Sequence, residues 1–293
     1  METVGFYIFF AFNWIVTLLP LSVLYLFSDL IFVILYYFPS YRRDIVDTNL
    51  RNAFPGKSPE ERKLIARKYY RHLADLFVEV MKITHMSGKQ LKKRFVINDL
   101  DLLDRLYEKN KDIVAVMAHY NNWEWLTILS AMTRYKTVSI YKPLHNKNFN
   151  KLINSYRSKF GMVLTPMNMI VREIIDDRKK NILTLSAFIN DQIPAKGDIR
   201  YWAKFLNQDT AIYLGAEKIA AKYNMSLVYF HVQKLKRGYY CLNIDLLFED
   251  TAGLPEGAIT EAHLRKLENI ITENPEYWLW SHRRWKHKKH ENA

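Results

Sequence analysis

His119 and Glu124 are the two residues whose types and spacing could support acid–base chemistry. Both lie in the segment HYNNWE at residues 119–124, directly after the apolar run of residues 113–117. On a continuous helix, five positions would turn the two side chains about 140° apart. Contact therefore requires His119 in a turn and Glu124 in the first turn of a helix, where the helix dipole favours a carboxylate.

In that arrangement Glu124 accepts the proton on one imidazole nitrogen of His119 and leaves the other nitrogen free as a base. Such a base could deprotonate a hydroxyl as the hydroxyl oxygen attacks an acyl carbonyl. The local pattern alone leaves a second interpretation open, in which His119 is structural and Glu124 only caps a helix.

The elements that must position these residues alternate between strand and helix. Apolar runs of strand length occur at residues 113–117, 137–141, 182–186 and 227–231. Helical patterns lie between or beside them, at residues 59–83, 99–109, 149–160, 170–177, 210–223 and 260–272. This alternation predicts an α/β fold with a largely parallel central sheet flanked by helices. Residues 239–247 predict one further strand, which could run either parallel or antiparallel to the others. His119 would then lie beyond the carboxyl end of a strand, where α/β sheets bind ligands.

The N-terminus predicts a membrane anchor. Residues 6–27 contain no ionisable side chain except tyrosine, and 22 residues of helix span roughly 33 Å, enough for a hydrocarbon core of about 30 Å. Arg42, Arg43 and Arg51 follow this segment and no basic residue precedes it, which places the rest of the chain on the cytoplasmic side. A cleaved signal peptide and a buried core helix are the alternatives. We therefore expect an anchor over residues 1–38 and one domain over residues 39–293.

Composition restricts the partners. The chain has 43 Lys and Arg against 30 Asp and Glu, a net charge of +13, and 14% of its 293 residues are aromatic. These values favour an acidic partner, either an anionic membrane or a nucleic acid. A basic tail, with Arg283, Arg284, Lys286, Lys288 and Lys289, is either solvated or drawn to anionic headgroups or to an acidic carrier protein. The single cysteine, Cys241, excludes a disulfide framework and a Cys-rich zinc site.

Six short motifs resemble, in order, those of one enzyme family. HYNNWE resembles the HxxNWE signature of the bacterial lipid A late acyltransferases, the lauroyl/myristoyl acyltransferase family within the wider lysophospholipid acyltransferase group. The other matches are Arg51-Asn-Ala-Phe-Pro55, Tyr141-Lys142-Pro143, Arg157 with Gly161, Asp191-Gln192 followed by Thr210, Gly215 and Ala220, and the closing stretch from Pro275 to Lys286. The resemblance covers nearly the whole chain.

This resemblance implies an enzyme of the inner membrane, with its catalytic domain on the cytoplasmic side. It would move an acyl chain from a thioester, on acyl carrier protein or coenzyme A, to a hydroxyl of a lipid A-type glycolipid. His119 would be the general base and Glu124 its orienting group. Neither a metal nor a cofactor is expected, because a base and oxyanion stabilisation suffice for thioester acyl transfer. Five residues are expected to bind substrate: Asn122, Arg157, Asp191, Gln192 and Lys142. Asn122 would shape the site, and Arg157 would bind a phosphate or the oxyanion. Asp191 would fix either Arg157 or the acceptor.

Two departures from the family pattern affect the expected substrate. Asn121 stands where the family has glycine, and glycine tolerates a positive φ far better. Phe205-Leu206-Asn207 replaces an aromatic-glycine pair. The alternatives are therefore an acyltransferase for another glycolipid or a lysophospholipid and, in a different class, a membrane-tethered nucleic-acid-binding protein or a scaffold. No nucleic-acid-binding module is recognisable in the sequence, so we expect no nucleic acid partner.

Overall fold

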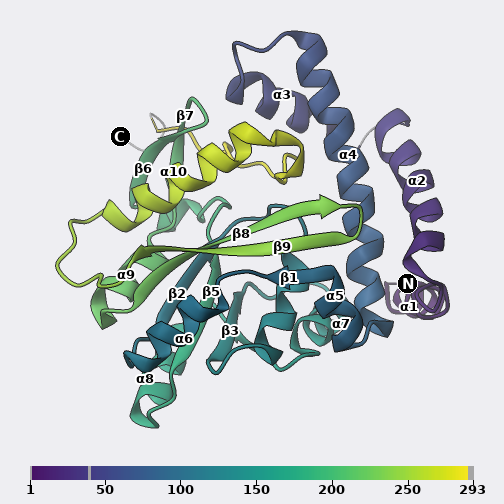
Figure 1. Cartoon of the computed structure of the whole chain (residues 1–293). Coiled ribbons are helices and arrows are strands. Elements are labelled where there is room, and N and C mark those ends of the chain that lie inside the picture. Colours follow the sequence, from purple (N-terminus) through teal and green to yellow (C-terminus); the bar gives the residue numbers. More distant parts are fainter. Residues whose placement is uncertain (1, 39–40, 290–293) are drawn as a thin grey trace.

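The computed structural model describes residues 2–38 and 41–289 and is built on a twisted sheet (Figure 1). Within this described part the sheet has seven strands in the order β1-β9-β8-β2-β5-β3-β4. The strands are β1 (Phe95–Ile97), β2 (Ile113–Met117), β3 (Lys136–Tyr141), β4 (Val163–Pro166), β5 (Thr184–Ile189), β8 (Ser226–Lys236) and β9 (Tyr239–Phe248). A separate antiparallel hairpin consists of β6 (Tyr201–Phe205) and β7 (Gln208–Ile212).

The strand directions confirm the predicted α/β class. Strands β8, β2, β5, β3 and β4 run parallel to one another, and β1 is parallel to β9. Strand β9 pairs antiparallel with β8, so β9 and β1 run opposite to the other five strands. Because β2 and β5 are adjacent and parallel, their carboxyl ends lie side by side at one edge of the sheet. The segment that begins with His119 follows one of these ends, and Asp191 follows the other.

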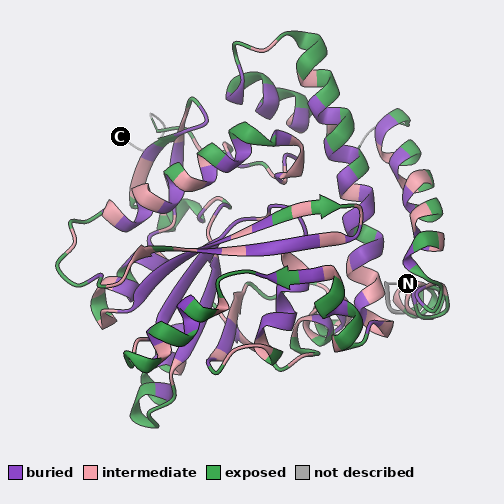
Figure 2. Ribbon diagram, in the orientation of Figure 1, coloured by how far each residue is buried: buried purple, intermediate pink, exposed green. Residues whose placement is uncertain are grey.

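Helices cover both faces of the sheet. The first face packs against α8 (Ile170–Lys179), α9 (Gly215–Tyr223) and α10 (Ala258–Glu273). The second packs against α5 (Gly88–Arg94), α6 (Leu100–Glu108), α7 (Lys147–Ser158) and the 3₁₀ helix η2 (Trp123–Ala131). The strands between them are largely buried (Figure 2), as their continuous apolar runs require.

A long helix, α4 (Pro59–Lys82), contributes side chains to both cores and packs against α2 (Leu21–Tyr37). It begins at a capping box, in which the Ser58 hydroxyl accepts from the Glu61 backbone N–H and the Glu61 carboxylate accepts from the Ser58 N–H. Helix α3 (Arg43–Ala53), which the sequence did not predict, packs against the same helix.

One predicted helix is wrong in its first half. Residues 208–212 form β7, and helix begins only at Gly215. The positive φ angles of Leu206 (47°) and Asn207 (63°) turn the chain into this hairpin, so the departure from the family's glycine pattern marks a tight turn.

The single helix expected over residues 6–27 is also wrong. The chain forms α1 (Glu2–Val16) and α2, separated at Pro20, which has no N–H to continue a helix. The carbonyls of Thr17 and Leu19, left free at this break, accept hydrogen bonds from Lys82 Nζ at 2.6 and 2.8 Å. Over residues 2–38 and 41–289, no helix combines the length and apolarity needed to cross a membrane.

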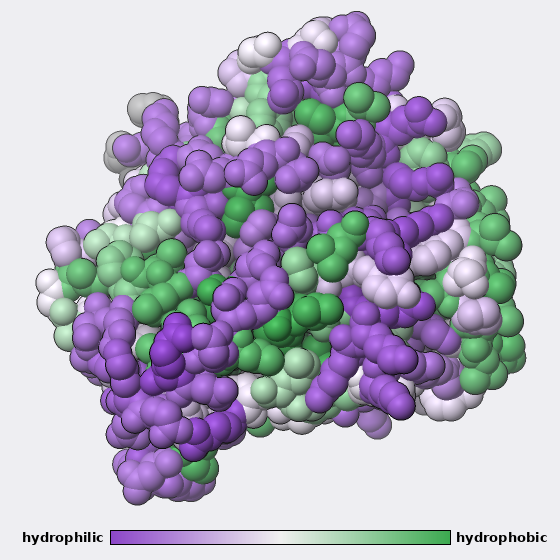
Figure 3. All heavy atoms as spheres, in the orientation of Figure 1, coloured by the Kyte–Doolittle hydropathy of each residue, from purple (hydrophilic) through white to green (hydrophobic). Residues whose placement is uncertain are grey.

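Helices α1 and α2 nevertheless expose many large apolar side chains. Figure 3 shows apolar side chains gathered along the edge of the molecule where these two helices lie. Their exposed members include Val4, Tyr7, Ile8, Phe12, Trp14, Ile15, Leu26, Leu30, Ile34 and Tyr37.

We predict that Asp112, just before β2, is a major contributor to stability. Its buried carboxylate accepts from the backbone and hydroxyl of Thr184 at 2.8 and 3.0 Å and from Arg178 Nε at 2.8 Å. Asp112→Ala should lower the free energy of unfolding by about 2–4 kcal/mol, because it leaves buried donors unpaired. Urea denaturation measures this.

The control for that measurement is Asp101→Ala, which removes an exposed ion pair with Arg105 on α6. Exposed pairs contribute little. Equal losses of stability in the two variants would contradict the role given to Asp112.

Candidate active site

The turn after β2 carries four consecutive residues of the HYNNWE segment. Asn121 adopts a positive φ of 53°, the conformation for which glycine is the usual residue. Its side chain compensates by donating to the Val232 carbonyl at 2.8 Å, and its backbone N–H bonds to the Tyr277 carbonyl at 3.0 Å. Asparagine thus preserves a left-handed turn here.

His119 points from this turn at Asp191, which lies in the loop after β5. The ring Nδ1 of His119 is 2.7 Å from Asp191 Oδ1, and the His119 backbone N–H bonds to Oδ2 at 3.0 Å. The Asp191 side chain is 3% exposed and that of His119 is 17% exposed. A neutral imidazole that donates Nδ1–H to this carboxylate has its Nε2 free as a base.

Trp278 supplies a third donor to the same carboxylate. Its indole Nε1 bonds to Asp191 Oδ2 at 2.8 Å, and its backbone pairs with Tyr120 in an isolated bridge. The indole is buried, 2% exposed, and its ring packs edge-on against that of Trp280. The C-terminal segment is therefore part of the site, although the sequence analysis gave its residues no catalytic role.

The surroundings of Asp191 favour the charged form of its carboxyl. Burial raises the pKa of its carboxyl, but the attraction of the His119 ring and the hydrogen bonds from His119 and Trp278 outweigh burial. The pKa consequently lies below the ordinary value.

Glu124 lies in the first turn of η2, as expected, and pairs with Arg157 on α7. Arg157 Nε bonds to Glu124 Oε2 at 2.8 Å, Nη2 bonds to Oε1, and the Trp123 indole donates to Oε1 at 3.0 Å. Burial raises the pKa of Glu124, but Arg157 more than offsets it, so the pKa is lowered overall. The Trp123 ring in turn stands edge-on to the His119 ring, with centroids 5.0 Å apart.

The structure thus exchanges the partners expected for the two carboxylates. Asp191 makes the contact with the imidazole that Glu124 was expected to make, and Glu124 holds the arginine that Asp191 was expected to fix. The reason is topological, since β5 lies beside β2 and delivers Asp191 directly to His119.

The remaining predicted residues occupy different positions. Asn122 is buried, and its side-chain oxygen accepts from the Trp125 N–H at 3.3 Å, which caps η2. The amide nitrogen of Gln192 lies 3.3 Å from Nε2 of His119. Lys142 is exposed in the loop after β3 and has no hydrogen bond or ion pair to another predicted site residue within the described part of the chain.

Arg284 of the basic tail and the neighbouring His282 are turned into the protein rather than toward solvent. Arg284 is 2% exposed, and burial lowers its pKa to about 10. His282 accepts from the Ile193 N–H at 3.4 Å, two residues after Asp191, and burial lowers its pKa to about 4. Apart from the motif around Pro275, no sequence signal could have placed them beside the site.

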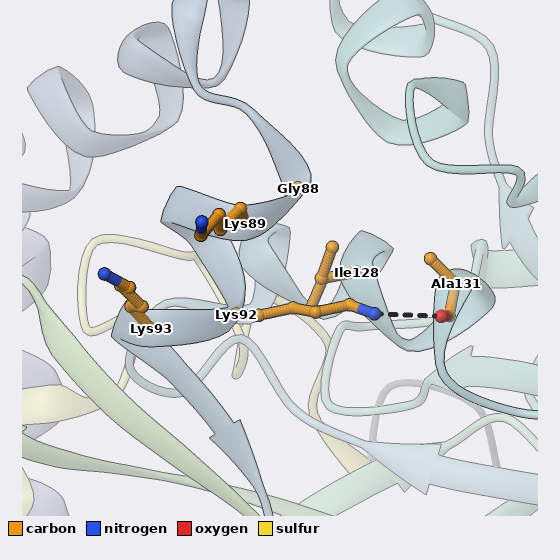
Figure 4. A pocket seen from close by; sticks show the side chains of 6 residues that line it. All are labelled: Gly88, Lys89, Lys92, Lys93, Ile128 and Ala131. Atoms are coloured by element: carbon orange, nitrogen blue, oxygen red, sulfur yellow. Dashed lines mark hydrogen bonds between the residues drawn. The ribbon is translucent and has the colours of Figure 1, made fainter.

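An apolar cavity of about 680 Å³ opens beside Trp123 and Glu124. It lies among α1, α2, α4 and α7, and its apolar lining includes Phe9, Ile31, Leu35, Leu73, Leu76, Phe149, Leu152 and Ile153. A basic hollow beside α5 (Figure 4), where Lys92 Nζ bonds to the Ala131 carbonyl at 3.2 Å, contains none of the predicted site residues. In the described part of the chain, no three His, Cys, Asp or Glu side chains cluster as a metal site.

Comparison with known proteins identifies the family. A family model described as "Bacterial lipid A biosynthesis acyltransferase" matches residues 1–287. The chain belongs to this family. The resemblance drawn from the motifs is confirmed, and with it the prediction that the chain is an acyltransferase.

Two relatives of this acyltransferase are similar over most of their length. They are named "Lipid A biosynthesis palmitoleoyltransferase" in Escherichia coli (strain K12) and "Lipid A biosynthesis acyltransferase" in Shigella flexneri. Each is 22% identical over 275 residues, which cover 93% of this chain and 88% of the relative. At that identity the side-chain geometry of this acyltransferase has to be read from its own residues.

Asp191 should make the acyltransferase less stable in acid. Because its folded-state pKa is below the ordinary carboxyl value, its contribution is complete above about pH 5 and is lost as pH falls through the folded-state pKa. Asp191→Asn has no proton to take up, so it should lose less free energy of unfolding between pH 6 and pH 3 than the wild type. Urea denaturation at a series of pH values tests this, and parallel curves for the two proteins would refute it.

Proposed function

We propose that this acyltransferase moves a fatty acyl chain from an acyl-carrier-protein thioester to a hydroxyl of a lipid A precursor. The names of the relatives support the acceptor. The observation that carries the reaction is the contact of His119 with the buried Asp191, next to Trp123, which lines an apolar cavity. Coenzyme A is the alternative carrier, and another glycolipid or a lysophospholipid is the alternative acceptor.

In this mechanism His119 exchanges one proton. Its Nε2 takes the proton of the acceptor hydroxyl as the hydroxyl oxygen attacks the thioester carbonyl carbon. The new C–O bond gives a tetrahedral intermediate, which collapses by breaking the C–S bond. The imidazolium then returns the proton to the departing thiolate.

Asp191 orients the ring and stabilises the imidazolium. The amide nitrogen of Gln192 lies 3.3 Å from Nε2, next to the place where the acceptor hydroxyl would bind, which supports its predicted place among the substrate-binding residues. Glu124 acts through Arg157. Two nitrogens of Arg157 are engaged by Glu124, and Nη1 has no hydrogen bond within the described residues, which leaves it to donate to a phosphate or to the oxyanion.

The cavity beside Trp123 would hold the acyl chain. Its volume is in the range of about 300–1,000 Å³ that is typical of ligand pockets, and its walls are mostly apolar. Trp123 and Glu124 line the cavity wall, and the Trp123 ring packs against the His119 ring, so a chain in the cavity would begin near the base.

The exposed apolar side chains of α1 and α2 support action at a lipid surface. We propose that this surface is the cytoplasmic side of the inner membrane and that the basic side chains contact anionic lipids. An anchor over residues 1–38, followed by a domain over residues 39–293, stays a prediction, since α2 also packs on α4.

Removing the base should abolish transfer. His119→Ala should lower kcat by about 10²–10⁴-fold, the usual contribution of a general base. Asp191→Asn should also lower kcat, because the amide no longer selects the Nδ1–H tautomer. Transfer of a labelled acyl chain from acyl carrier protein to a lipid A precursor measures both.

His145→Ala, in the exposed loop after β3, is the control and should keep the wild-type rate. Mass spectrometry of the product identifies the acceptor. Wild-type rates in His119→Ala, or a product that is not an acylated lipid A precursor, would contradict the proposed function.

Filling the cavity should change the chain length that is used. Leu76 lines the cavity from α4, so Leu76→Phe should shift the preference toward shorter acyl chains. Leu64→Phe is the matched control on the exposed side of the same helix. Competition among acyl thioesters of different length measures the preference, and an unchanged preference in Leu76→Phe would refute the assignment.

A further inference from the structure

A buried carboxylate outside the proposed reaction lies directly behind the active-site turn. Glu79 on α4 is 0% exposed and accepts hydrogen bonds from three elements. Tyr25 of α2 donates to Oε1 at 2.8 Å, while Tyr240 of β9 and Asn122 of the turn each donate to Oε2 at 2.8 Å. The Glu79 backbone carbonyl also accepts from the Trp125 indole at 3.1 Å.

The contact with Asn122 fixes the direction of the amide. Because Asn122 Nδ2 donates to Glu79, Asn122 Oδ1 is turned toward the Trp125 N–H and caps η2. Trp123 and Glu124 lie between Asn122 and Trp125 in sequence. A change in Asn122 would therefore move both the indole that packs on His119 and the carboxylate that holds Arg157.

We propose that Glu79 is a positioning residue for acyl transfer, acting through Asn122 to fix the turn that presents Trp123 and Glu124. The role rests on the proposed function. Tyr25 connects this carboxylate to α2, whose outer face is apolar. The hydrogen bond between Tyr25 and Glu79 therefore links the packing of α2 against α4 to the site.

The hydrogen-bond pattern predicts which substitutions are tolerated. In Glu79→Gln the carbonyl oxygen can still accept from Asn122 and Tyr240, while the new NH₂ donates to the Tyr25 hydroxyl, which can also accept. Glu79→Gln should therefore keep kcat within about threefold of the wild type. In Glu79→Ala the Asn122 amide loses its partner, and kcat should fall about tenfold or more.

An exchange of donor and acceptor provides the decisive experiment. Asn122→Asp alone sets two acceptors against each other and should lower kcat about tenfold or more. Adding Glu79→Gln restores the bond, because the new NH₂ can donate both to the carboxylate introduced at position 122 and to the Tyr240 hydroxyl. The double variant should recover most of the lost kcat, with unchanged KM values. A double variant no faster than Asn122→Asp overturns the proposal.

Two further measurements separate positioning from other causes. Amide hydrogen exchange at Trp125 in the full chain should quicken in Asn122→Asp and slow again in the double variant; no change in either would overturn the proposal. Tyr240→Phe should lower kcat severalfold, whereas Tyr135→Phe, which removes a buried hydroxyl bonded to the Lys111 carbonyl, should not. Equal effects of the two tyrosine variants would indicate a purely structural role.

These measurements also distinguish the two proposals. If the wild type does not acylate a lipid A precursor, the proposed function fails, and exchange at Trp125 still decides whether Glu79 fixes the turn. If the wild type is active and the double variant shows no recovery, only the role of Glu79 fails.

Discussion

The contact between Asp191 and His119 is the constraint on which the rest of the site depends. A carboxylate buried at a strand end is costly unless donors surround it, and here the donors come from a ring nitrogen, a backbone N–H and an indole. These donors belong to the turn after β2 and to the C-terminal segment. The carboxylate thus ties together three parts of the chain that are far apart in sequence.

A second polar layer supports the first from behind. Glu124 at the cavity wall forms a partly buried ion pair with Arg157, and Glu79 and Asn122 form a hydrogen-bonded pair beneath the same turn. The carboxylates of Asp191, Glu124 and Glu79 each accept hydrogen bonds from a different set of donors, so none of them could take the place of another. Hydrogen bonds and an ion pair therefore hold the polar side of the site, while its other side is an apolar cavity bounded by helices.

The sequence predicted the sheet and the local structure of the HYNNWE segment well, because both depend on local patterns. Four apolar runs became parallel strands, and HYNNWE lies at a strand end in the predicted turn and helix start. Sequence could not show that β5 lies beside β2, and so it assigned the partners of Glu124 and Asp191 the wrong way round. The prediction of a single N-terminal helix was wrong for a similar reason. The break at Pro20 is stabilised by Lys82, which is more than sixty residues away in the sequence.

The tautomer of His119 tests the central claim most directly. Nitrogen-15 NMR of histidine-labelled protein, at a pH where the ring is neutral, distinguishes a proton on Nδ1 from one on Nε2. The account predicts the Nδ1–H form in the wild type, held by Asp191, and loss of that form in Asp191→Asn but not in Glu124→Gln. An Nε2–H ring in the wild type, or a tautomer that responds to Glu124 and not to Asp191, would contradict it.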